Sequence, residues 1–218
     1  MAQPHAPGFF VVFEGGEGSG KSTQVRALAA RLQAQGVDVV TTREPGGTPI
    51  AEQIRDLVLA DNNADMGPRC EALLFAAARA EHVDKTIRPA LQRGAVVISD
   101  RFSESSVAYQ GAGRGLGMTD VAGLSAWAIQ DVAPDLTFLL DAEPEVGLAR
   151  ALDPNRLEAE QLEFHQTLRV ALHELAEADP AAHVVIAGGA AQEEIAEQVW
   201  VEVQRRLVSA NQVPVPTP

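Results

Sequence analysis

Residues 9–23 carry the feature that most constrains the fold of this chain. An apolar run from Phe9 to Phe13 leads into Gly15-x-x-x-x-Gly20-Lys21-Ser22. This is the spacing of a P-loop, in which a strand enters a glycine-rich turn and a helix follows. The glycines let backbone N–H groups surround phosphate oxygens, the lysine reaches the β- and γ-phosphates, and the serine hydroxyl ligates Mg²⁺. The expected ATP-binding residues are Gly15, Gly16, Glu17, Gly18, Ser19, Gly20, Lys21, Ser22 and Thr23.

The alternative interpretation of this stretch is a glycine-rich turn that binds no ligand. Only two lysines, Lys21 and Lys85, occur in the chain, so a chance lysine at this position is improbable. The strand before the turn and the helix after it supply the context that the motif requires. We therefore favour a nucleotide site.

The composition predicts one globular domain. The chain has 218 residues, is 46% hydrophobic and contains no apolar run of membrane-spanning length. The first eight residues lack the charged and apolar segments of a secretory signal, so we expect a cytoplasmic protein. We expect a flexible N-terminus over 1–8, a single domain over 9–207 and a disordered proline-rich tail over 208–218.

The charge and the single cysteine limit the possible partners and cross-links. A net charge of −13 argues against broad nucleic-acid binding, although a local basic cluster could still exist within the acidic surface. Cys70 is the only cysteine, which excludes an intrachain disulfide and fits a reducing compartment. We expect Cys70 to pack in the core.

Strand and helix patterns alternate along the whole chain. Alternation of this kind predicts an α/β fold with a five-stranded, mainly parallel sheet flanked by helices. Thr48 is placed to cap the second helix, and Pro89 lies near the end of the third. The expected strands are 9–14, 37–42, 95–99, 136–141 and 183–186, and the expected helices after the P-loop helix are 49–60, 69–92, 119–131, 144–152, 160–178 and 191–207.

Several polar residues follow directly after predicted strands. Parallel strands place Gly15, Arg43, Asp100 and Asp141 at one edge of the sheet, where such sheets bind ligands. Arg43 and Arg101 beside a P-loop indicate a second anion site, because arginine binds phosphate in a bidentate manner. An acceptor that already carries a phosphate needs such a site, so the pattern favours a nucleoside monophosphate kinase.

Two carboxylates compete for the metal. Asp100 ends an apolar strand in the manner of a Walker-B acid and could hold Mg²⁺ together with Ser22. Asp141 ends another strand in the same way, with Glu143 close behind it. We favour Ser22 and Asp100 as the metal site and leave Asp141 open.

Five segments in order make the chain resemble the bacterial thymidylate kinase family over about residues 9–207. They are the P-loop with acidic Glu17, Thr42-Arg43-Glu44-Pro45-Gly46-Gly47-Thr48, Leu73-Leu74-Phe75 with Arg79, Asp100-Arg101-Phe102, and Ser105-Ser106-Val107-Ala108-Tyr109-Gln110. The resemblance implies a three-layer P-loop kinase fold with a short lid at about 150–160. It also implies ATP and Mg²⁺ as cofactors, transfer of the ATP γ-phosphoryl group to dTMP, and a homodimer.

The resemblance further implies roles for individual residues. Glu17 should face the sugar 3′-hydroxyl of the acceptor, and Arg43 and Arg101 should hold its phosphate. The base site should comprise Phe75 stacked on thymine, Arg79 at the O4 carbonyl, Ser106 and Gln110 at the N3 edge, and Tyr109 at the 2′ position. Without the family, core packing is the preferred interpretation of Phe75, and Tyr109 could equally be structural.

The lid departs from the family pattern. Members with glycine at the position of Gly18 supply arginines to the transferred phosphoryl group from the lid, yet the stretch 149–158 is short and holds few. Arg156 is our first choice for that role and Arg150 the second, beside Lys21, Arg101 and Glu17 as catalytic residues. We predict that Arg156→Ala depresses kcat more than dTMP binding. Thr167 and Leu172 stand where an arginine and a tyrosine are common.

Three other functions are open to a chain with a P-loop. A GTP-dependent switch needs an Asn-Lys-x-Asp motif, which two lysines at 21 and 85 cannot provide. A P-loop module that binds nucleotide without turnover is disfavoured by Lys21, Ser22, Asp100 and the paired arginines. The main alternative is a kinase of another nucleoside monophosphate or of a deoxynucleoside.

Overall fold

Strand β1 (Phe9–Glu14) lies at the centre of a five-stranded sheet in the computed structural model, which describes residues 8–150 and 155–209. The strand order is β2-β3-β1-β4-β5, and every neighbouring pair is parallel. The predicted sheet is therefore confirmed, and it is parallel throughout. The other strands are β2 (Val39–Arg43), β3 (Val96–Asp100), β4 (Leu136–Asp141) and β5 (His183–Ala187).

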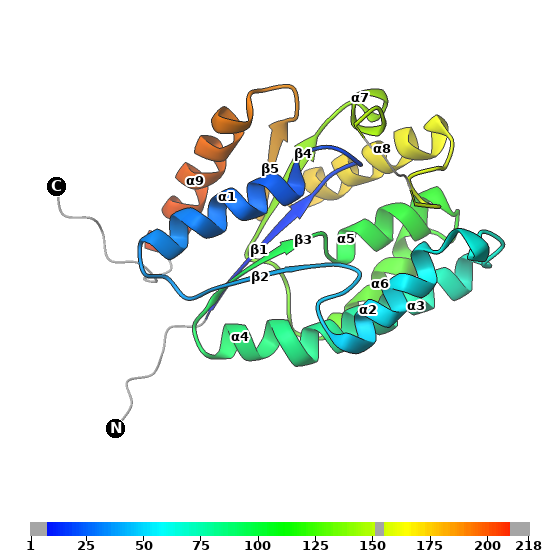
Figure 1. Ribbon diagram of the computed structural model, residues 1–218, viewed down its shortest axis with the longest axis horizontal. Helices are drawn as coiled ribbons and strands as arrows, with labels where there is room; N and C mark the ends of the chain where they lie inside the picture. The colour runs from blue at the N-terminus through cyan, green and yellow to red at the C-terminus, as the bar shows by residue number, and fades with distance from the viewer. Residues whose placement is uncertain (1–7, 151–154, 210–218) are drawn as a thin grey trace.

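Side chains of β1 alternate between two hydrophobic layers. Phe9, Val11 and Phe13 pack on the side that is covered by α1 (Lys21–Ala34) and α9 (Gln192–Ser209). Phe10 and Val12 face the opposite side, where the remaining helices lie (Figure 1). Both faces of the central strands are buried, which explains why their sequences are continuously apolar.

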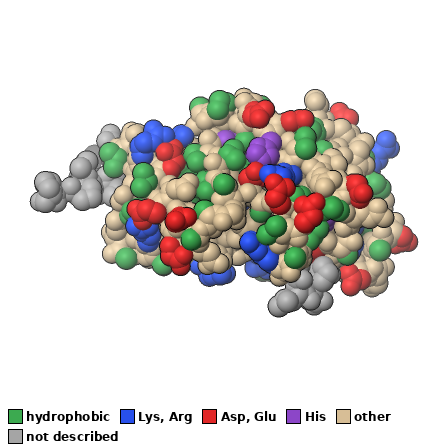
Figure 2. Space-filling model, turned by 90° about the horizontal axis from the view of Figure 1, so that it is seen from above, with side chains coloured by type: hydrophobic (Ala, Val, Ile, Leu, Met, Phe, Trp, Pro, Cys, Tyr) green, Lys and Arg blue, Asp and Glu red, His purple; other side chains and the backbone are tan. Residues whose placement is uncertain are grey.

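The remaining helices cover the second face and the carboxyl edge of the sheet. They are α2 (Pro49–Leu59), the 3₁₀ turn η1 (Asp61–Asn63), α3 (Pro68–His82), α4 (Arg88–Gln92), α5 (Ser103–Ser106), α6 (Met118–Ile129), α7 (Pro144–Leu148) and α8 (Leu162–Ala178), with π-helical turns at η2 (Val83–Ile87) and η3 (Val107–Gly113). In Figure 2 acidic side chains are spread over the face in view with basic ones between them. No helix in the described ranges is long and apolar enough to cross a bilayer.

The helix predicted over 69–92 is interrupted. The backbone stays helical but widens into η2 before α4 begins, and the N–H of Arg88 bonds the carbonyl of Val83. Pro89 explains the change, because proline cannot donate to the carbonyl four residues earlier and its ring needs room there. The helix predicted over 144–152 ends earlier, at Leu148, where the N–H of Arg150 bonds the carbonyl of Gly147.

Two side-chain predictions had opposite outcomes. Thr48 caps α2 as expected, since its hydroxyl accepts from the N–H of Ala51 at 3.1 Å. The prediction that Cys70 packs in the core is wrong: Cys70 is exposed. Helix α3 turns its other faces inward, so that Glu71 and Phe75 are buried.

The expected ends of the domain lie partly outside the described residues. Residues 1–7, 151–154 and 210–218 are not described, so the predicted N-terminus, part of the lid and most of the tail stay predictions. Helix α9 continues to Ser209, two residues beyond the expected end of the domain.

Candidate functional site

A cavity of about 660 Å³ opens at the carboxyl edge of β1 and β3. Most of the residues that the sequence nominates line it, including those expected for ATP and for dTMP. Gly15, Gly16 and Arg156 do not. The nominated residues in the lining are Glu17, Gly18, Ser19, Gly20, Lys21, Ser22, Thr23, Arg43, Phe75, Arg79, Asp100, Arg101, Ser106, Tyr109, Gln110 and Arg150.

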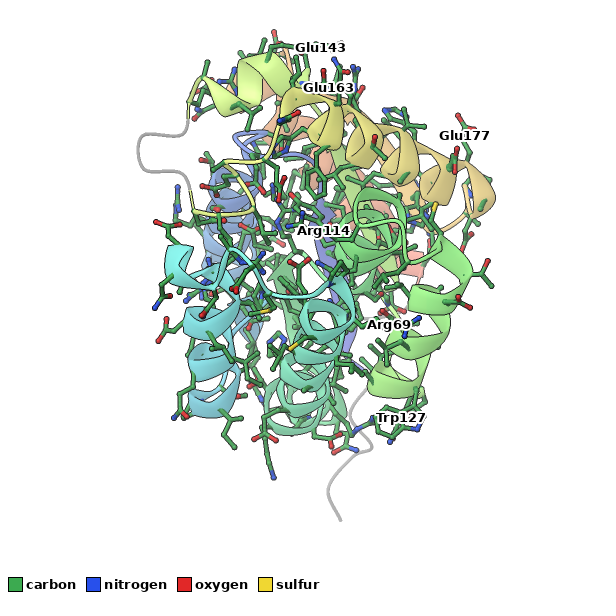
Figure 3. The ribbon with its side chains drawn as sticks, turned by 90° about the vertical axis from the view of Figure 1, so that its right-hand side faces the viewer. Arg69, Arg114, Trp127, Glu143, Glu163 and Glu177 are labelled. Atoms are coloured by element: carbon green, nitrogen blue, oxygen red, sulfur yellow. The ribbon has the colours of Figure 1, made fainter. Side chains whose placement is uncertain are left out.

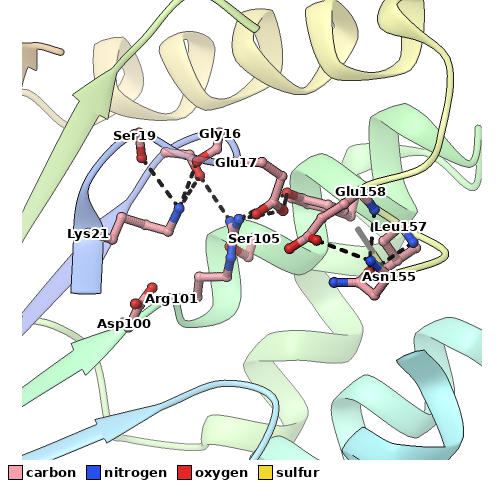
Figure 4. Close-up of polar contacts among 12 residues, drawn as sticks. Gly16, Glu17, Ser19, Lys21, Asp100, Arg101, Ser105, Asn155, Leu157 and Glu158 are labelled. Carbon is pink, nitrogen blue, oxygen red and sulfur yellow. Dashed lines mark hydrogen bonds and ion pairs between the residues drawn. The ribbon is translucent and has the colours of Figure 1, made fainter. Parts of the chain in front are cut away.

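The P-loop is held in place by its own lysine. Lys21 is buried at the start of α1, and its Nζ donates to the carbonyl oxygens of Gly15 at 3.1 Å and Gly16 at 2.7 Å (Figure 4). Gly15 adopts φ 143°, and a Cβ there would lie 2.5 Å from the carbonyl oxygen of Leu140. The two glycines outside the lining therefore position the lysine, and only glycine fits where the loop meets β4.

A second close approach explains why position 18 is glycine. Gly18 has φ 61°, and a Cβ at this position would lie 2.2 Å from the carbonyl oxygen of Gly147 in α7. A Cβ on Gly147 would likewise lie 2.0 Å from the carbonyl oxygen of Glu17. The loop and α7 are packed backbone to backbone, so no arginine side chain can start from position 18.

The side chain of Arg101 contacts both the P-loop and residues that are expected to bind the acceptor. Its φ of 72° is unusual for a residue with a side chain and turns the guanidinium back over β1. It donates to the carbonyl of Gly15 at 3.0 Å, to Ser105 Oγ at 3.1 Å, to Glu17 Oε1 at 2.8 Å and to the Tyr109 hydroxyl at 3.0 Å. One guanidinium therefore fixes groups from both halves of the cavity.

Glu14, which was not among the predicted site residues, stabilises the backbone that follows Arg101. The carboxylate ends β1 with 1% exposure and accepts from the N–H groups of Phe102 and Ser105 and from Ser105 Oγ at 2.6 Å. Burial raises the pKa of Glu14 to about 7 despite these bonds. The only signal in the sequence was an acid ending an otherwise apolar strand.

The charged groups of the cavity shift one another's pKa values. Burial raises the pKa of Glu17, but Arg101 and Lys21 outweigh it and lower this pKa to about 2. Tyr109 contributes by donating its hydroxyl to Glu17 Oε1 at 2.6 Å. Burial and the nearby Arg101 lower the pKa of Lys21 to about 8. Glu17 is therefore a carboxylate at neutral pH, and Lys21 titrates just above neutrality.

The lowered pKa of Lys21 leads to a measurable proton uptake. Phosphate oxygens favour the ammonium form, so binding of MgATP should raise this pKa and take up about half a proton at pH 8. At about pH 6.5 Lys21 is already protonated and the uptake should vanish. Calorimetry in buffers of different ionisation enthalpy measures the number of protons. Equal uptake at the two pH values would mean that Lys21 does not meet the phosphates.

Three arginines meet on the acceptor side. Arg43 at the end of β2 pairs with Glu52 at 2.8 Å and borders the cavity together with Arg101. Arg55 on α2 joins them: burial, and then the proximity of Arg43, lower its pKa, and its Nη1 donates to the carbonyl of Pro45 at 2.9 Å. The sequence analysis missed Arg55. The available signal was its place one turn after Glu52, on a helix that starts beside Arg43.

The residues expected around the base line the part of the cavity formed by α3, α5 and η3. Phe75 is 9% exposed. It packs in a hydrophobic cluster and also lines the cavity, so its position is compatible with both core packing and stacking on a base. Arg79 is 2% exposed and donates to Ser106 Oγ at 3.0 Å. The amide nitrogen of Gln110 donates to Glu71 at 2.9 Å.

The structure also separates the two candidate metal ligands. Ser22 Oγ donates to Asp100 Oδ2 at 2.5 Å at the cavity edge, so two hard oxygen donors lie side by side. Asp141 instead pairs with Arg169 at 2.6 and 2.9 Å and with His173 at 3.1 Å. Within 8–150 and 155–209 no three His, Cys, Asp or Glu residues cluster as a metal site. One carboxylate with a hydroxyl fits Mg²⁺, which keeps phosphate and water ligands.

The two lid arginines lie in different places. Arg150 lines the cavity, and its Nη1 donates to the carbonyl of Gly18 at 2.9 Å. Arg156 is buried away from the P-loop, where its Nε donates to the carbonyl of Val58 at 2.6 Å and its Nη2 forms an ion pair with Glu71 at 2.7 Å. The structure thus brings Arg150, but not Arg156, beside the phosphate loop.

Glu158, also missed, lies where the lid segment meets the cavity. It borders the cavity, and its carboxylate accepts from the N–H of Asn155 at 3.1 Å (Figure 4). Burial and the nearby Glu17 raise the pKa of Glu158. The segment after the undescribed residues is therefore folded down onto the acceptor side.

Comparison with known proteins finds similar sequences and structures over most of the chain. The family model described as thymidylate kinase matches residues 13–199. A thymidylate kinase of Pseudomonas fluorescens is 51% identical over 203 residues, 92% of this chain and 93% of the relative. One of Pelobacter propionicus is 45% identical over 210 residues, 92% of this chain and 96% of the relative. The crystal structure of thymidylate kinase from Ehrlichia chaffeensis superposes with a TM-score of 0.73 at 33% identity, covering 91% of this chain and 99% of that one.

The family model spans most of the chain, and both relatives are matched over nearly their whole length. The P-loop, the arginine pair and the residues expected around the base contribute to the cavity lining, and they lie in the segments on which the sequence resemblance rests. On these grounds the chain belongs to the thymidylate kinase family.

Proposed function

We propose that this chain transfers the γ-phosphoryl group of ATP to dTMP, giving dTDP and ADP for dTTP synthesis. The observation that carries this function is one cavity that is lined both by the P-loop lysine and by a cluster of three arginines. The P-loop and Lys21 form one end, and Arg43, Arg55 and Arg101 form the other. A nucleoside kinase has no use for a second cluster of this kind, because its acceptor carries no phosphate.

The acceptor is held by groups of matching chemistry. The ring of Phe75 offers a flat face to the pyrimidine, and Arg79, Ser106 and Gln110 surround its polar edge. Glu17 accepts from the sugar 3′-hydroxyl, while Tyr109, bonded to Glu17, fills the space beside the sugar 2′ position. Arg43, Arg55 and Arg101 hold the phosphate that attacks.

Phosphoryl transfer here depends on positioning and on neutralising charge, so no covalent nucleophile and no general base are assigned. Lys21 and the P-loop amides hold the donor phosphates, and Arg101 reaches both ends of the cavity through Gly15 and Glu17. Arg150 is placed above Gly18 to meet the transferred group. Ser22 and Asp100 would hold Mg²⁺, which would supply positive charge beside the donor phosphates.

We further infer that the chain acts as a homodimer in the cytoplasm, where its donor ATP is available. Leu73 on α3 is 59% exposed and Trp127 on the neighbouring α6 is 78% exposed, and Figure 3 shows Trp127 projecting outward. Two large apolar side chains on adjacent helices favour burial against a second copy. Sedimentation of the purified chain measures its mass in solution.

A coupled assay over a panel of monophosphates tests the function. With MgATP as donor, dTMP should be the best acceptor, ahead of dUMP, UMP, CMP, AMP and GMP, and thymidine should not react. The contrast between dTMP and thymidine isolates the second phosphate site. If another monophosphate were preferred, the base-site assignments would be wrong, and if thymidine reacted equally well the arginine cluster would have another purpose.

A further inference from the structure

Four side chains form a hydrogen-bonded line behind the base pocket. Thr42 Oγ1 lies 2.6 Å from His82 Nε2, His82 Nδ1 lies 3.0 Å from Glu44 Oε1, and Glu44 Oε2 accepts from Arg79 Nε at 2.7 Å. The line runs from β2, across the end of α3, to the arginine that faces the base. His82 is fully buried, and Arg79 and Glu44 are 2% and 5% exposed.

The chemistry of the line fixes the ring of His82. Glu44 pairs with the guanidinium of Arg79, so its carboxylate is an acceptor on both oxygens. His82 Nδ1 must then carry the hydrogen that Glu44 accepts. In the neutral imidazole Nε2 has a free lone pair, and the hydroxyl of Thr42 donates to it. Each member thus dictates the orientation of the next.

The far end of the line determines where the guanidinium of Arg79 points. Its Nε is committed to Glu44, and its Nη2 donates to Ser106 Oγ at 3.0 Å and to the carbonyl of Phe102 at 3.1 Å. Its Nη1 makes a longer contact of 3.5 Å with Ser125 Oγ. A planar guanidinium bound on two sides has one orientation available. Glu44 is the one charged partner among these, so it contributes most to the edge that Arg79 offers to the cavity, and His82 in turn orients Glu44.

The loop around the line is shaped to admit the imidazole. Gly47 has φ 85°, and a Cβ there would lie 2.5 Å from the Cδ2 and Nε2 atoms of His82. Thr86 Oγ1 donates to the carbonyl of Gly47 at 3.0 Å and holds the loop in that position. The stretch that sends Arg43 toward the acceptor phosphate thus also sends Glu44 inward and leaves room for His82.

We propose that His82 is a positioning residue for recognition of the acceptor base. It orients Glu44, and Glu44 holds Arg79 in the one orientation that meets the pyrimidine carbonyl. His82 does not line the cavity and touches no substrate. The proposal rests on the proposed function, since it assumes a pyrimidine monophosphate as the acceptor.

Three substitutions of His82 separate positioning from packing. The amide nitrogen of asparagine falls near the Nδ1 position and can still donate to Glu44, whereas that of glutamine falls near Nε2 and cannot. We expect His82→Gln and His82→Ala to raise KM for dTMP about tenfold. His82→Asn should stay within about threefold of the native protein, and KM for ATP should change less than about twofold in all three. The preference for dTMP over dCMP should fall with the rise in KM.

The outcomes test the role of His82 separately from the proposed function. If the native protein does not favour dTMP, the proposed function fails. If it does, native KM values for dTMP in both His82→Gln and His82→Ala would overturn the inference. Equal losses in the asparagine and glutamine variants, or equal rises in KM for ATP and dTMP, would also overturn it, since they indicate packing alone. Should the alanine variant not fold, the asparagine and glutamine pair decides.

Discussion

Replacing Arg101 by alanine is expected to lower kcat/KM for dTMP about a thousandfold, the size seen when an arginine that stabilises a transferred phosphoryl group is lost. Arg101 bonds Gly15 of the donor loop and Glu17 of the acceptor side with one guanidinium. Without it, Glu17 loses the main attraction that offsets its burial, so its pKa rises from about 2. Steady-state kinetics with dTMP and ATP varied in turn measure the loss.

Two further variants control this experiment. Arg101→Lys keeps the charge but cannot reach four partners at once, so an intermediate loss is expected. Arg93→Ala removes an exposed arginine that pairs with Asp38 before the start of β3, and kinetics close to native are expected. Kinetics close to native in Arg101→Ala would contradict the assigned role.

Substitution of the two lid arginines is expected to have different effects, one on turnover and the other on stability. Arg150→Ala should lower kcat about a hundredfold while KM for dTMP changes less than about threefold, because Arg150 lies at the P-loop and touches no acceptor group. Arg156→Ala should instead lower the free energy of unfolding by about 3 kcal/mol, since it takes from the buried Glu71 carboxylate the closer of its two arginine partners, at 2.7 Å against 3.3 Å for Arg114. That loss corresponds to a fall in Tm of about 6–12 °C.

Calorimetric Tm values and kinetics well below Tm separate these effects. Arg150 is exposed and its loss should leave Tm within about 2 °C of native. The prediction from the sequence was a fall in kcat for Arg156→Ala. If that variant loses as much kcat as Arg150→Ala while its Tm is unchanged, the sequence-based order of the two arginines stands and the one proposed from the geometry is withdrawn.

The sheet and the P-loop could be predicted because each depends on local sequence. Continuous apolar runs gave the three central strands, and Thr48 gave a helix start that the structure confirms. The expected strand at 37–42 is shifted to Val39–Arg43, where half-exposed β2 forms the edge of the sheet. Its weak apolar pattern fixes its start less firmly than the central runs fix theirs.

The parts that could not be predicted depend on contacts between distant segments. The positive φ of Arg101 is stabilised by Gly15, Glu17 and Glu14 at the end of another strand, which no local pattern reveals. Arg156 lies within the expected lid, where a phosphoryl-binding arginine would stand. Arg156 instead pairs with Glu71 on α3. The buried and exposed faces of α3 contain similar residue types, so the sequence does not show that Glu71 is buried.

Because β1 lies between β3 and β4, neither of its neighbours exists when β1 is made. Synthesis must pass Val96 before one edge can pair and Leu136 before the other can. At about 5–20 residues per second, the stretch Phe-Phe-Val-Val-Phe emerges several seconds before its first partner strand. An apolar strand with two open edges is prone to aggregate. Any chain released before Leu136 therefore carries the complete P-loop on a strand that remains unpaired along one side.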